Sequence, residues 1–234
     1  MRKILLFAVL SLPLLAQAGD DDKKKKKDFF ENTYVGLNWG PDFYIWKDKA
    51  SAGSTGYSYY PQFSQTLGLE FVKGVSEKVL ISVGLQNSVK AFERTDECLT
   101  CPPENTYTPV SVFKTYYTQV PVSAYFLLSN SRLDVIGILG VNNSFFRQAK
   151  QEMNAYDGST QHFSPNSSFR KYMMTINAGV GFNYNVNLHF SWGMNVLYHQ
   201  PIIKDFYSSG TKYANDPAVK MFGFGMNTSV YYKF

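Results

Sequence analysis

Residues 219–234 read VKMFGFGMNTSVYYKF, and this stretch decides the fold because its side chains alternate in character. Every second position back from the end is apolar or aromatic apart from one threonine: Phe234, Tyr232, Val230, Thr228, Met226, Phe224 and Phe222. The positions between them are mostly small or polar: Lys233, Tyr231, Ser229, Asn227, Gly225, Gly223 and Met221. A period of two predicts a β-strand with two different faces. Because the second face carries Gly, Asn and Ser, we expect it to line a crowded, wet barrel interior, with the apolar face turned to lipid.

The composition fits a single sizeable domain built mainly of strands. Of the 234 residues, 17% are aromatic and 18% charged, which is not the composition of a disordered chain. Tyr and Phe greatly outnumber Trp and favour strands over helices. The mean hydropathy of -0.23 argues against a helical membrane protein, but it fits a barrel in which only alternate residues meet lipid. The net charge of +5 is dominated by one lysine run, so it does not predict nucleic-acid binding.

Residues 1–18 have the layout of a secretory signal peptide. Arg2 and Lys3 form the positive start, residues 4–15 are apolar, and Ala16-Gln17-Ala18 is a small-X-small cleavage site. The apolar run is too short to span a membrane as a helix. We therefore expect Sec-type export and cleavage near Ala18.

Residues 19–32 form a charged leader that includes the run DDDKKKKKD at 20–28. Such a run predicts a solvated, flexible segment. The alternative is a lysine cluster that contacts acidic headgroups or neighbouring proteins. The barrel domain is expected to occupy residues 33–234.

Seven stretches before the last one alternate in the same way. They lie at residues 34–45, 63–73, 79–93, 113–128, 133–148, 171–185 and 188–200. Together with the last stretch they predict eight antiparallel strands. Pro41 and Asp42 interrupt the first of them and suggest a β-bulge.

The connections between these strands alternate between short and long. The short ones are residues 74–78, 129–132 and 186–187, and the long ones are 46–62, 94–112, 149–170 and 201–218. This rhythm predicts an all-β, up-and-down transmembrane barrel with short periplasmic turns and four long extracellular loops. An even number of strands also allows closure, which removes the unpaired edges that lipid does not tolerate. The alternative is a secreted soluble barrel of lipocalin type, which would need an apolar interior and a charged exterior.

Four charged residues fall on the face expected to line the lumen: Glu70, Lys90, Lys171 and Lys233. The interior of an eight-stranded barrel is just wide enough to be filled by side chains. Glu70 is therefore expected to pair with a lumen lysine or a tyrosine hydroxyl, because an unpaired buried charge is costly. We interpret these charges as structural, and a pathway for solutes is disfavoured by size.

Cysteine and histidine are too sparse to predict a metal, a cofactor or a catalytic centre. Cys98 and Cys101 are the only cysteines, and a disulfide at the tip of the second long loop is the expected outcome outside the cytoplasm. Among the three histidines, the best local set for hydrolysis is His199 with Asp205 and Ser208. Polar residues of this kind are common in loops, so we expect no enzyme and no cofactor.

The stretch Tyr117-Thr-Gln-Val-Pro-Val-Ser-Ala-Tyr-Phe126 places a proline where a central strand should not tolerate one. It resembles the (aromatic)-x-x-(Ile/Val)-Pro-(Leu/Val) strand of the Bacteroidetes outer-membrane β-barrel family, the porin family or PorT-like proteins. The ending Tyr232-Lys-Phe234 is similar to the terminal strand that outer-membrane barrels present to the barrel-assembly machinery. The resemblance implies a small, OmpX-like barrel of a Gram-negative outer membrane, and for PorT itself a role in type IX secretion. It carries no catalytic motif.

Three functions follow from these expectations. The first is a non-enzymatic structural, secretion-accessory or surface-interaction component, in contact with outer-membrane lipid and with secretion or surface proteins. The second is a narrow porin for passive passage of small solutes or ions. The third is a lipid- or peptide-processing enzyme at the barrel rim.

Overall fold

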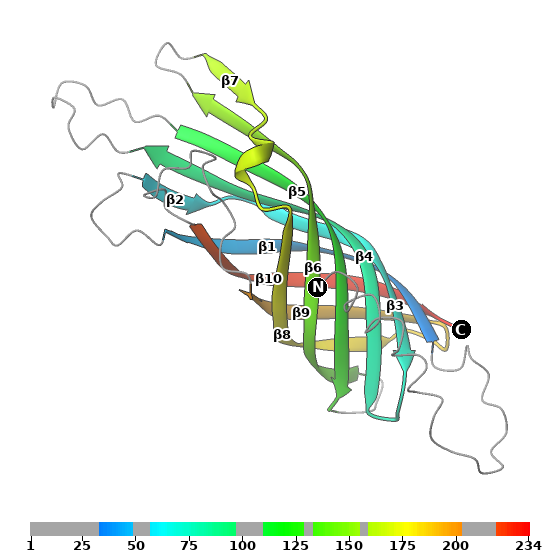
Figure 1. Cartoon of the computed structure of the whole chain (residues 1–234). Helices are drawn as coiled ribbons and strands as arrows, with labels where there is room; N and C mark the ends of the chain where they lie inside the picture. Colours follow the sequence, from blue (N-terminus) through cyan, green and yellow to red (C-terminus); the bar gives the residue numbers. More distant parts are fainter. Residues whose placement is uncertain (1–32, 49–56, 97–109, 129–132, 155–158, 203–218) are drawn as a thin grey trace.

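A computed structural model describes residues 33–48, 57–96, 110–128, 133–154, 159–202 and 219–234. Eight strands form a closed ring in which every pair is antiparallel, in the order β4-β3-β1-β10-β9-β8-β6-β5, with β5 pairing again with β4. The ring strands are β1 (Thr33–Asp48), β3 (Ser64–Gly74), β4 (Val79–Asp96), β5 (Val110–Leu127), β6 (Leu133–Asn154), β8 (Tyr172–Asn185), β9 (Phe190–Pro201) and β10 (Val219–Lys233). The predicted eight-stranded fold is therefore confirmed, and each strand lies where its alternation placed it (Figure 1).

Apolar side chains cover the outside of the ring. One exterior residue from each ring strand illustrates the belt, each between 41% and 60% exposed: Leu37, Leu69, Leu85, Phe126, Leu139, Val180, Val196 and Val230. Soluble monomers rarely expose a continuous apolar surface of this extent. The inside carries the buried polar residues, so the two faces are opposite to those of a lipocalin-type barrel.

The two ends of the barrel differ. At one end tight turns join β3 to β4 and β8 to β9, with Val75 and Val186 donating backbone hydrogen bonds to Val79 and Phe190. The two ends of the described chain meet there too, because the amide of Phe234 donates to the carbonyl of Thr33 at 3.1 Å. We call this the short-turn end, and the opposite end the long-loop end.

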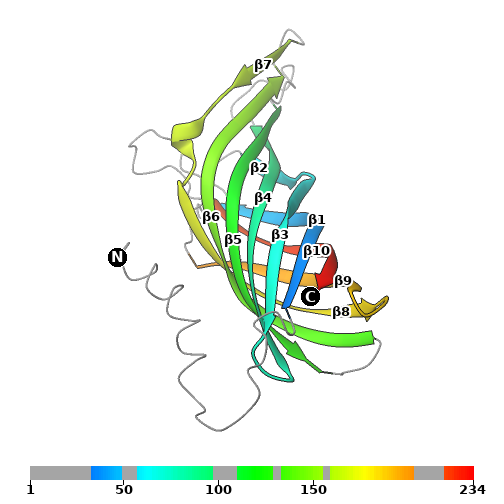
Figure 2. The ribbon, with the colours of Figure 1, turned by 90° about the vertical axis from the view of Figure 1, so that its right-hand side faces the viewer.

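Two short strands extend the sheet at the long-loop end, in stretches that were expected to be loops. β2 (Tyr57–Pro61) pairs with β4, and β7 (Thr160–Phe163) pairs with β6. We call β2, β7 and the adjoining ends of β4, β5 and β6 (residues 91–96, 110–115 and 149–154) the raised sheet. Figures 1 and 2 show β7 and the end of β6 standing furthest beyond the ring. Strand pairing along β4 and β6 orders these parts of the long connections, which are too short to show a period of their own.

The β-bulge expected at Pro41 is also wrong. The register of β1 against β10 is the same on both sides of this residue, since Trp39 faces Thr228 and Asp42 faces Gly225. Pro41 stays in line on its other side, where it faces Gln65 of β3. Proline has no N–H to donate, so the strand loses pairing toward β10 without gaining a residue.

Candidate functional site

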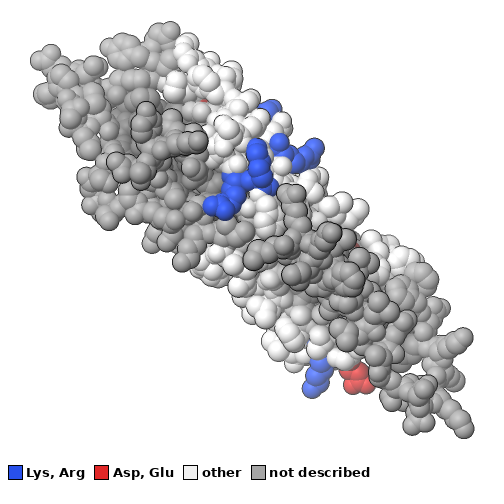
Figure 3. All heavy atoms as spheres, viewed as in Figure 1, with Lys and Arg blue, Asp and Glu red and all other residues white. Residues whose placement is uncertain are grey.

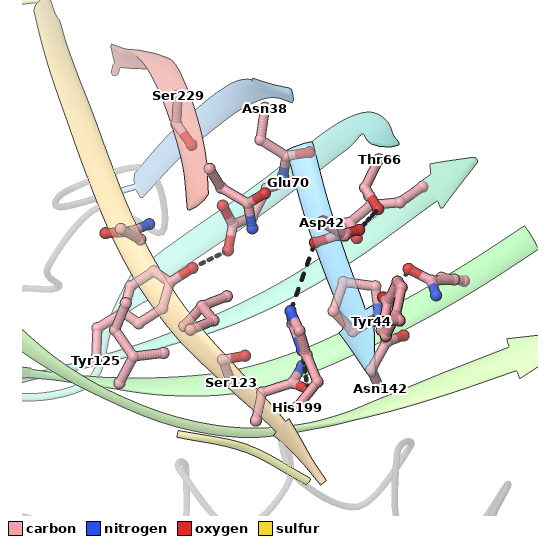
Figure 4. A pocket seen from close by; sticks show the side chains of 18 residues that line it. Asn38, Asp42, Tyr44, Thr66, Glu70, Ser123, Tyr125, Asn142, His199 and Ser229 are labelled. Carbon is pink, nitrogen blue, oxygen red and sulfur yellow. Dashed lines mark hydrogen bonds and ion pairs between the residues drawn. The ribbon is translucent and has the colours of Figure 1, made fainter. Parts of the chain in front are cut away.

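The middle of the lumen holds a buried carboxylate, Asp42 of β1, which is 3% exposed. The hydroxyl of Thr66 on β3 donates to its Oδ2 at 2.6 Å, and Nε2 of His199 on β9 lies 3.5 Å from its Oδ1. Gly225 of β10 faces this contact, and a Cβ there would lie 2.6 Å from His199 Nε2. The glycine therefore leaves the space in which three strands bring these side chains together (Figure 4).

His199 connects Asp42 to the neighbouring strand β8. Its Nδ1 lies 2.9 Å from Oδ1 of Asn177 on β8, so the imidazole N–H donates to this amide oxygen. With Nδ1 carrying that proton, the contact between Nε2 and Asp42 becomes an ion pair only when the imidazole is doubly protonated.

Lys90 is the buried cation of the lumen, at 2% exposed. Its Nζ donates to the hydroxyl of Tyr44 at 2.5 Å and lies 3.9 Å from the centre of the same ring. Asp42 attracts this ammonium group electrostatically. A buried cation and a buried anion therefore offset each other between β4 and β1, as a closed interior requires.

Glu70 forms a second polar layer nearer the short-turn end. The hydroxyls of Tyr125 and Tyr231 donate to its two carboxylate oxygens, the second at 2.9 Å. All three side chains are buried. A tyrosine hydroxyl was one of the two partner types expected for this residue.

The long-loop end of the lumen is filled by a chain of aromatic rings that we call the aromatic plug. Its members come from β1, β4, β5, β6 and the segment before β8: Tyr44, Trp46, Phe92, Phe113, Tyr117, Phe146 and Phe169. Neighbouring rings lie 4.4 Å apart at Trp46 and Phe92, and 4.8 Å apart and stacked at Phe92 and Phe113. Contacts at these distances leave no passage between the rings.

The lumen is thus a cup with an open mouth at the short-turn end and aromatic rings packed at the long-loop end. The space around Asp42 and His199 is a cavity of about 40 Å³, room for no more than a few water molecules. The mouth of the cup is a cavity of about 580 Å³ whose lining includes Tyr34, Asp134, His189 and Lys233. The Glu70 layer forms its floor, because Tyr125 lines both cavities, whereas Glu70 lines the inner one and Tyr231 lines the mouth.

Not every residue singled out in the sequence lies in the lumen. Lys171 was expected there, but its side chain is exposed at the long-loop rim and donates to the carbonyl of Asn166 at 2.7 Å. β8 begins one residue later, at Tyr172, so the alternation in the sequence extends one residue beyond the strand that forms the barrel wall. Lys233 is half-buried at the other rim, 5.6 Å from the centre of the Tyr34 ring.

The remaining predicted residues fall outside the lumen or outside the described residues. Tyr232 and Phe234 are exposed and their rings pack edge to face at 5.2 Å. Cys98, Cys101, Asp205 and Ser208, together with the signal peptide and leader, lie outside the described residues. The proposed set of His199 with Asp205 and Ser208 is therefore not described as a whole.

Sequence reasoning missed Asp42, the partner of His199. Asp42 shares the parity of Gly36 and Asn38, so the signal was the same alternation that selected Glu70. Within the described part of the chain, no group of three or more His, Cys, Asp or Glu is placed to hold a metal ion. The same part contains no helix that is long and apolar enough to cross a membrane.

Comparisons with known proteins give likeness in structure but not in sequence. No family model and no curated protein matches the chain. Solved structures that are similar include OprG of Pseudomonas aeruginosa (16% identity, 87% of this chain and 96% of that one, TM-score 0.48) and Neisserial surface protein A (13%, 87% and 98%, 0.47). The outer membrane protease OmpT of Escherichia coli is another (8%, 91% and 100%, 0.46). At these identities and scores the likeness decides nothing about activity, and none of them singles out a PorT-like family.

Proposed function

We propose that this protein is a non-conducting outer-membrane β-barrel that presents the raised sheet as a surface for interaction with another protein. The observation that carries the proposal is that the molecule has two structurally different parts. The ring has a lipid-compatible exterior and a filled lumen, whereas β4, β5 and β6 continue beyond the ring and recruit β2 and β7. The first part anchors the molecule and the second remains available for contact.

The height of the apolar belt supports a membrane location. On β4 the exterior positions from Val79 to Val89 are apolar apart from Asn87, and on β10 those from Phe222 to Tyr232 are apolar apart from Thr228, eleven residues in each case. A tilted strand needs about 9–11 residues to cross the hydrocarbon of a bilayer. The belt therefore matches one bilayer, and the ring leaves none of its own strand edges unpaired within it.

The filled lumen argues against passive transport. The aromatic plug and the layer of Asp42, His199 and Lys90 follow one another along the axis, and the cavity around Asp42 and His199, which extends to Glu70, has a volume of about 40 Å³. A solute larger than water would have to displace buried, hydrogen-bonded side chains. We therefore place the narrow-porin function second, and its only structural support is the open mouth of about 580 Å³.

The raised sheet has a feature suited to recognition, which is the strand β7. All four of its residues are exposed, and β6 is its one pairing partner among the described strands. An exposed edge strand carries unpaired N–H and C=O groups that another chain can pair with. The partner is inferred to be a protein that offers an extended segment.

Native sizing after mild detergent extraction of the membrane tests this function. The intact protein is expected to migrate in a complex larger than the lone barrel. Gln161→Pro and His162→Pro should each weaken that complex. Successive N–H groups of a strand point to opposite edges, so one of the two prolines removes an N–H from the free edge and the other removes a hydrogen bond that holds β7 to β6. Thr33→Ser, at the other end of the barrel, is the control. Migration of the wild-type protein as a lone barrel, or a complex that both proline variants leave unchanged, would contradict the proposal.

A further inference from the structure

A cluster of basic side chains stands on the outside of the barrel where β5 and β6 leave the apolar belt. Its members are exposed or half-buried and we call them the basic patch: Lys114 on β5, Arg147 and Lys150 on β6, and Arg170 just before β8. Figure 3 shows Lys and Arg side chains gathered on one side of the molecule, over the region where Figure 1 draws β5, β6 and η1 (Asn166–Ser168).

A β-bulge at Arg147 reverses the alternation of β6, so that Lys150 lies on the outside together with Arg147. The register of β5 against β6 shifts here, because Tyr116 faces Gln148 whereas Tyr117 faces Phe146, which leaves Arg147 as the extra residue. Bulges of this kind redirect side chains and are features of the fold rather than defects. Because of the extra residue, Arg147 and its neighbour Gln148 are both exposed.

The basic side chains are held close to one another by the strands that carry them. Arg147 donates from Nη1 to Oδ1 of Asn87 on the exterior of β4, at 3.2 Å, which orients the guanidinium group along the barrel wall. Lys150 is paired in register with Lys114 on the next strand. Tyr172 of β8 faces Phe145 of β6, and Arg170 precedes Tyr172 by two residues.

Acidic side chains are sparse around Arg147 and Lys150 in the described parts of β5 and β6. Glu152 lies 3.5 Å from Lys114 and is the one acidic residue in the described parts of β5 and β6 beyond the belt. On β4 the nearest carboxylate, Glu93, accepts a hydrogen bond from Gln62 at 2.9 Å. The face therefore keeps a net positive charge around Arg147 and Lys150.

The basic patch adjoins aromatic rings at the end of the apolar belt. Tyr116 is directly below it, with Lys150 5.9 Å from the centre of its ring, and Phe145 packs with Tyr172 at 5.4 Å. Aromatic rings of this kind mark the boundary between hydrocarbon and headgroups in membrane barrels. The basic side chains begin where the rings end.

We propose that the basic patch binds the phosphate groups of an anionic lipid headgroup in the leaflet on the long-loop side. Arginine and lysine are the side chains that bind phosphate best, and a basic cluster at a membrane surface attracts anionic headgroups. The proposal rests on the membrane location proposed above. It assigns the patch to lipid rather than to the protein partner of the raised sheet.

The test compares lipids that differ only in phosphate. The full-length mature protein, folded in zwitterionic detergent, is mixed with diphosphorylated lipid A or with the same lipid after removal of both phosphates, and retained lipid is measured by native mass spectrometry. Wild type is expected to retain the phosphorylated lipid alone. In the triple variant Arg147→Gln, Lys150→Gln, Arg170→Gln, affinity should fall about 100-fold, because each basic residue near a charged lipid surface contributes roughly a fivefold gain. The matched control, Lys73→Gln, Lys78→Gln, Lys233→Gln at the short-turn end, should bind as wild type does.

Three results would overturn the proposal. They are equal retention of both lipids, unchanged affinity in the triple variant, and displacement of the lipid by millimolar inorganic phosphate, which would show a site for free phosphate. If the triple variant fails to fold, the proposal is still tested by the three single variants and by the comparison of the two lipids on the wild-type protein. Protease protection of the wild-type protein in phosphatidylcholine vesicles tests membrane insertion separately. A protein that does not insert contradicts the proposed membrane location, whereas a protein that inserts but does not bind the phosphorylated lipid contradicts only the lipid site.

Discussion

Tyr231 and Glu70 are 161 residues apart in the chain, and the hydroxyl of Tyr231 donates to Oε2 of Glu70 at 2.9 Å inside the lumen. The two residues stand on β10 and β3, which do not pair with each other but lie on either side of β1. Closure of the ring between the first and last strands therefore creates the floor of the cup.

Glu70→Ala is expected to destabilise the barrel by about 1–3 kcal/mol, because it leaves the hydroxyls of Tyr125 and Tyr231 without their acceptor. The lower part of this range allows for water that enters from the mouth of the cup. Urea unfolding in detergent or vesicles, followed by tryptophan fluorescence, measures the change. Glu70→Gln keeps an acceptor oxygen and should cost less. A Glu70→Ala variant as stable as wild type would mean that the layer is not structural.

Gly36→Ala should destabilise the barrel by about 1–3 kcal/mol, because a Cβ at this position would collide with the ring of Tyr231. Gly137→Ala is the matched control. The nearest atom to a Cβ there is 3.9 Å away, so that variant should be neutral. The same unfolding assay compares them, and equal effects of the two variants would argue against a tightly filled floor.

Val180→Arg should destabilise the barrel by roughly 2–4 kcal/mol in a lipid bilayer, because it places a charge in the apolar belt. Val180 is 60% exposed, so a loss of packing inside the lumen does not explain such an effect. Thr160→Arg, at an exposed position of β7 outside the belt, is expected to be near neutral. Unfolding in phosphatidylcholine vesicles distinguishes the two, and a reversed order would show that the exterior does not face hydrocarbon.

Deletion of Phe234 should lower the amount of folded barrel recovered from the outer membrane. The terminal aromatic residues are exposed and carry the resemblance to the assembly signal, a role that stays a prediction. Quantitative immunoblotting of membrane fractions measures the effect, with Lys233→Gln as the control. Normal recovery of the shortened chain would remove the assembly role from Phe234 and Tyr232.

Most of the fold could be predicted because a barrel has one dominant signal. Side chains of a strand alternate between lipid and lumen, so faces, strands and turns are all readable from a period of two. The same alternation placed Glu70 and Lys90 in the lumen, where both are buried. It wrongly placed Lys171 in the lumen, because periodicity does not show at which residue a strand of the barrel wall begins.

The candidate site was less accessible to sequence reasoning because it depends on pairing between distant strands. Asp42 and His199 meet only through the register of β1, β10 and β9, which alternation does not specify. The bulge at Arg147 is likewise set by how β6 pairs with β5, whereas the proline at position 41 attracted attention and changes no register. β2 and β7 escaped detection because each has only four or five residues.

The central feature of this barrel is a lumen that is closed between the aromatic plug and the Glu70 layer. The most direct measurement is the conductance of the purified barrel in planar lipid bilayers at both polarities. We predict a folded, inserted protein with no discrete conductance steps. Reproducible unitary steps that change in size in Lys90→Ala would come from this lumen, and they would contradict the account.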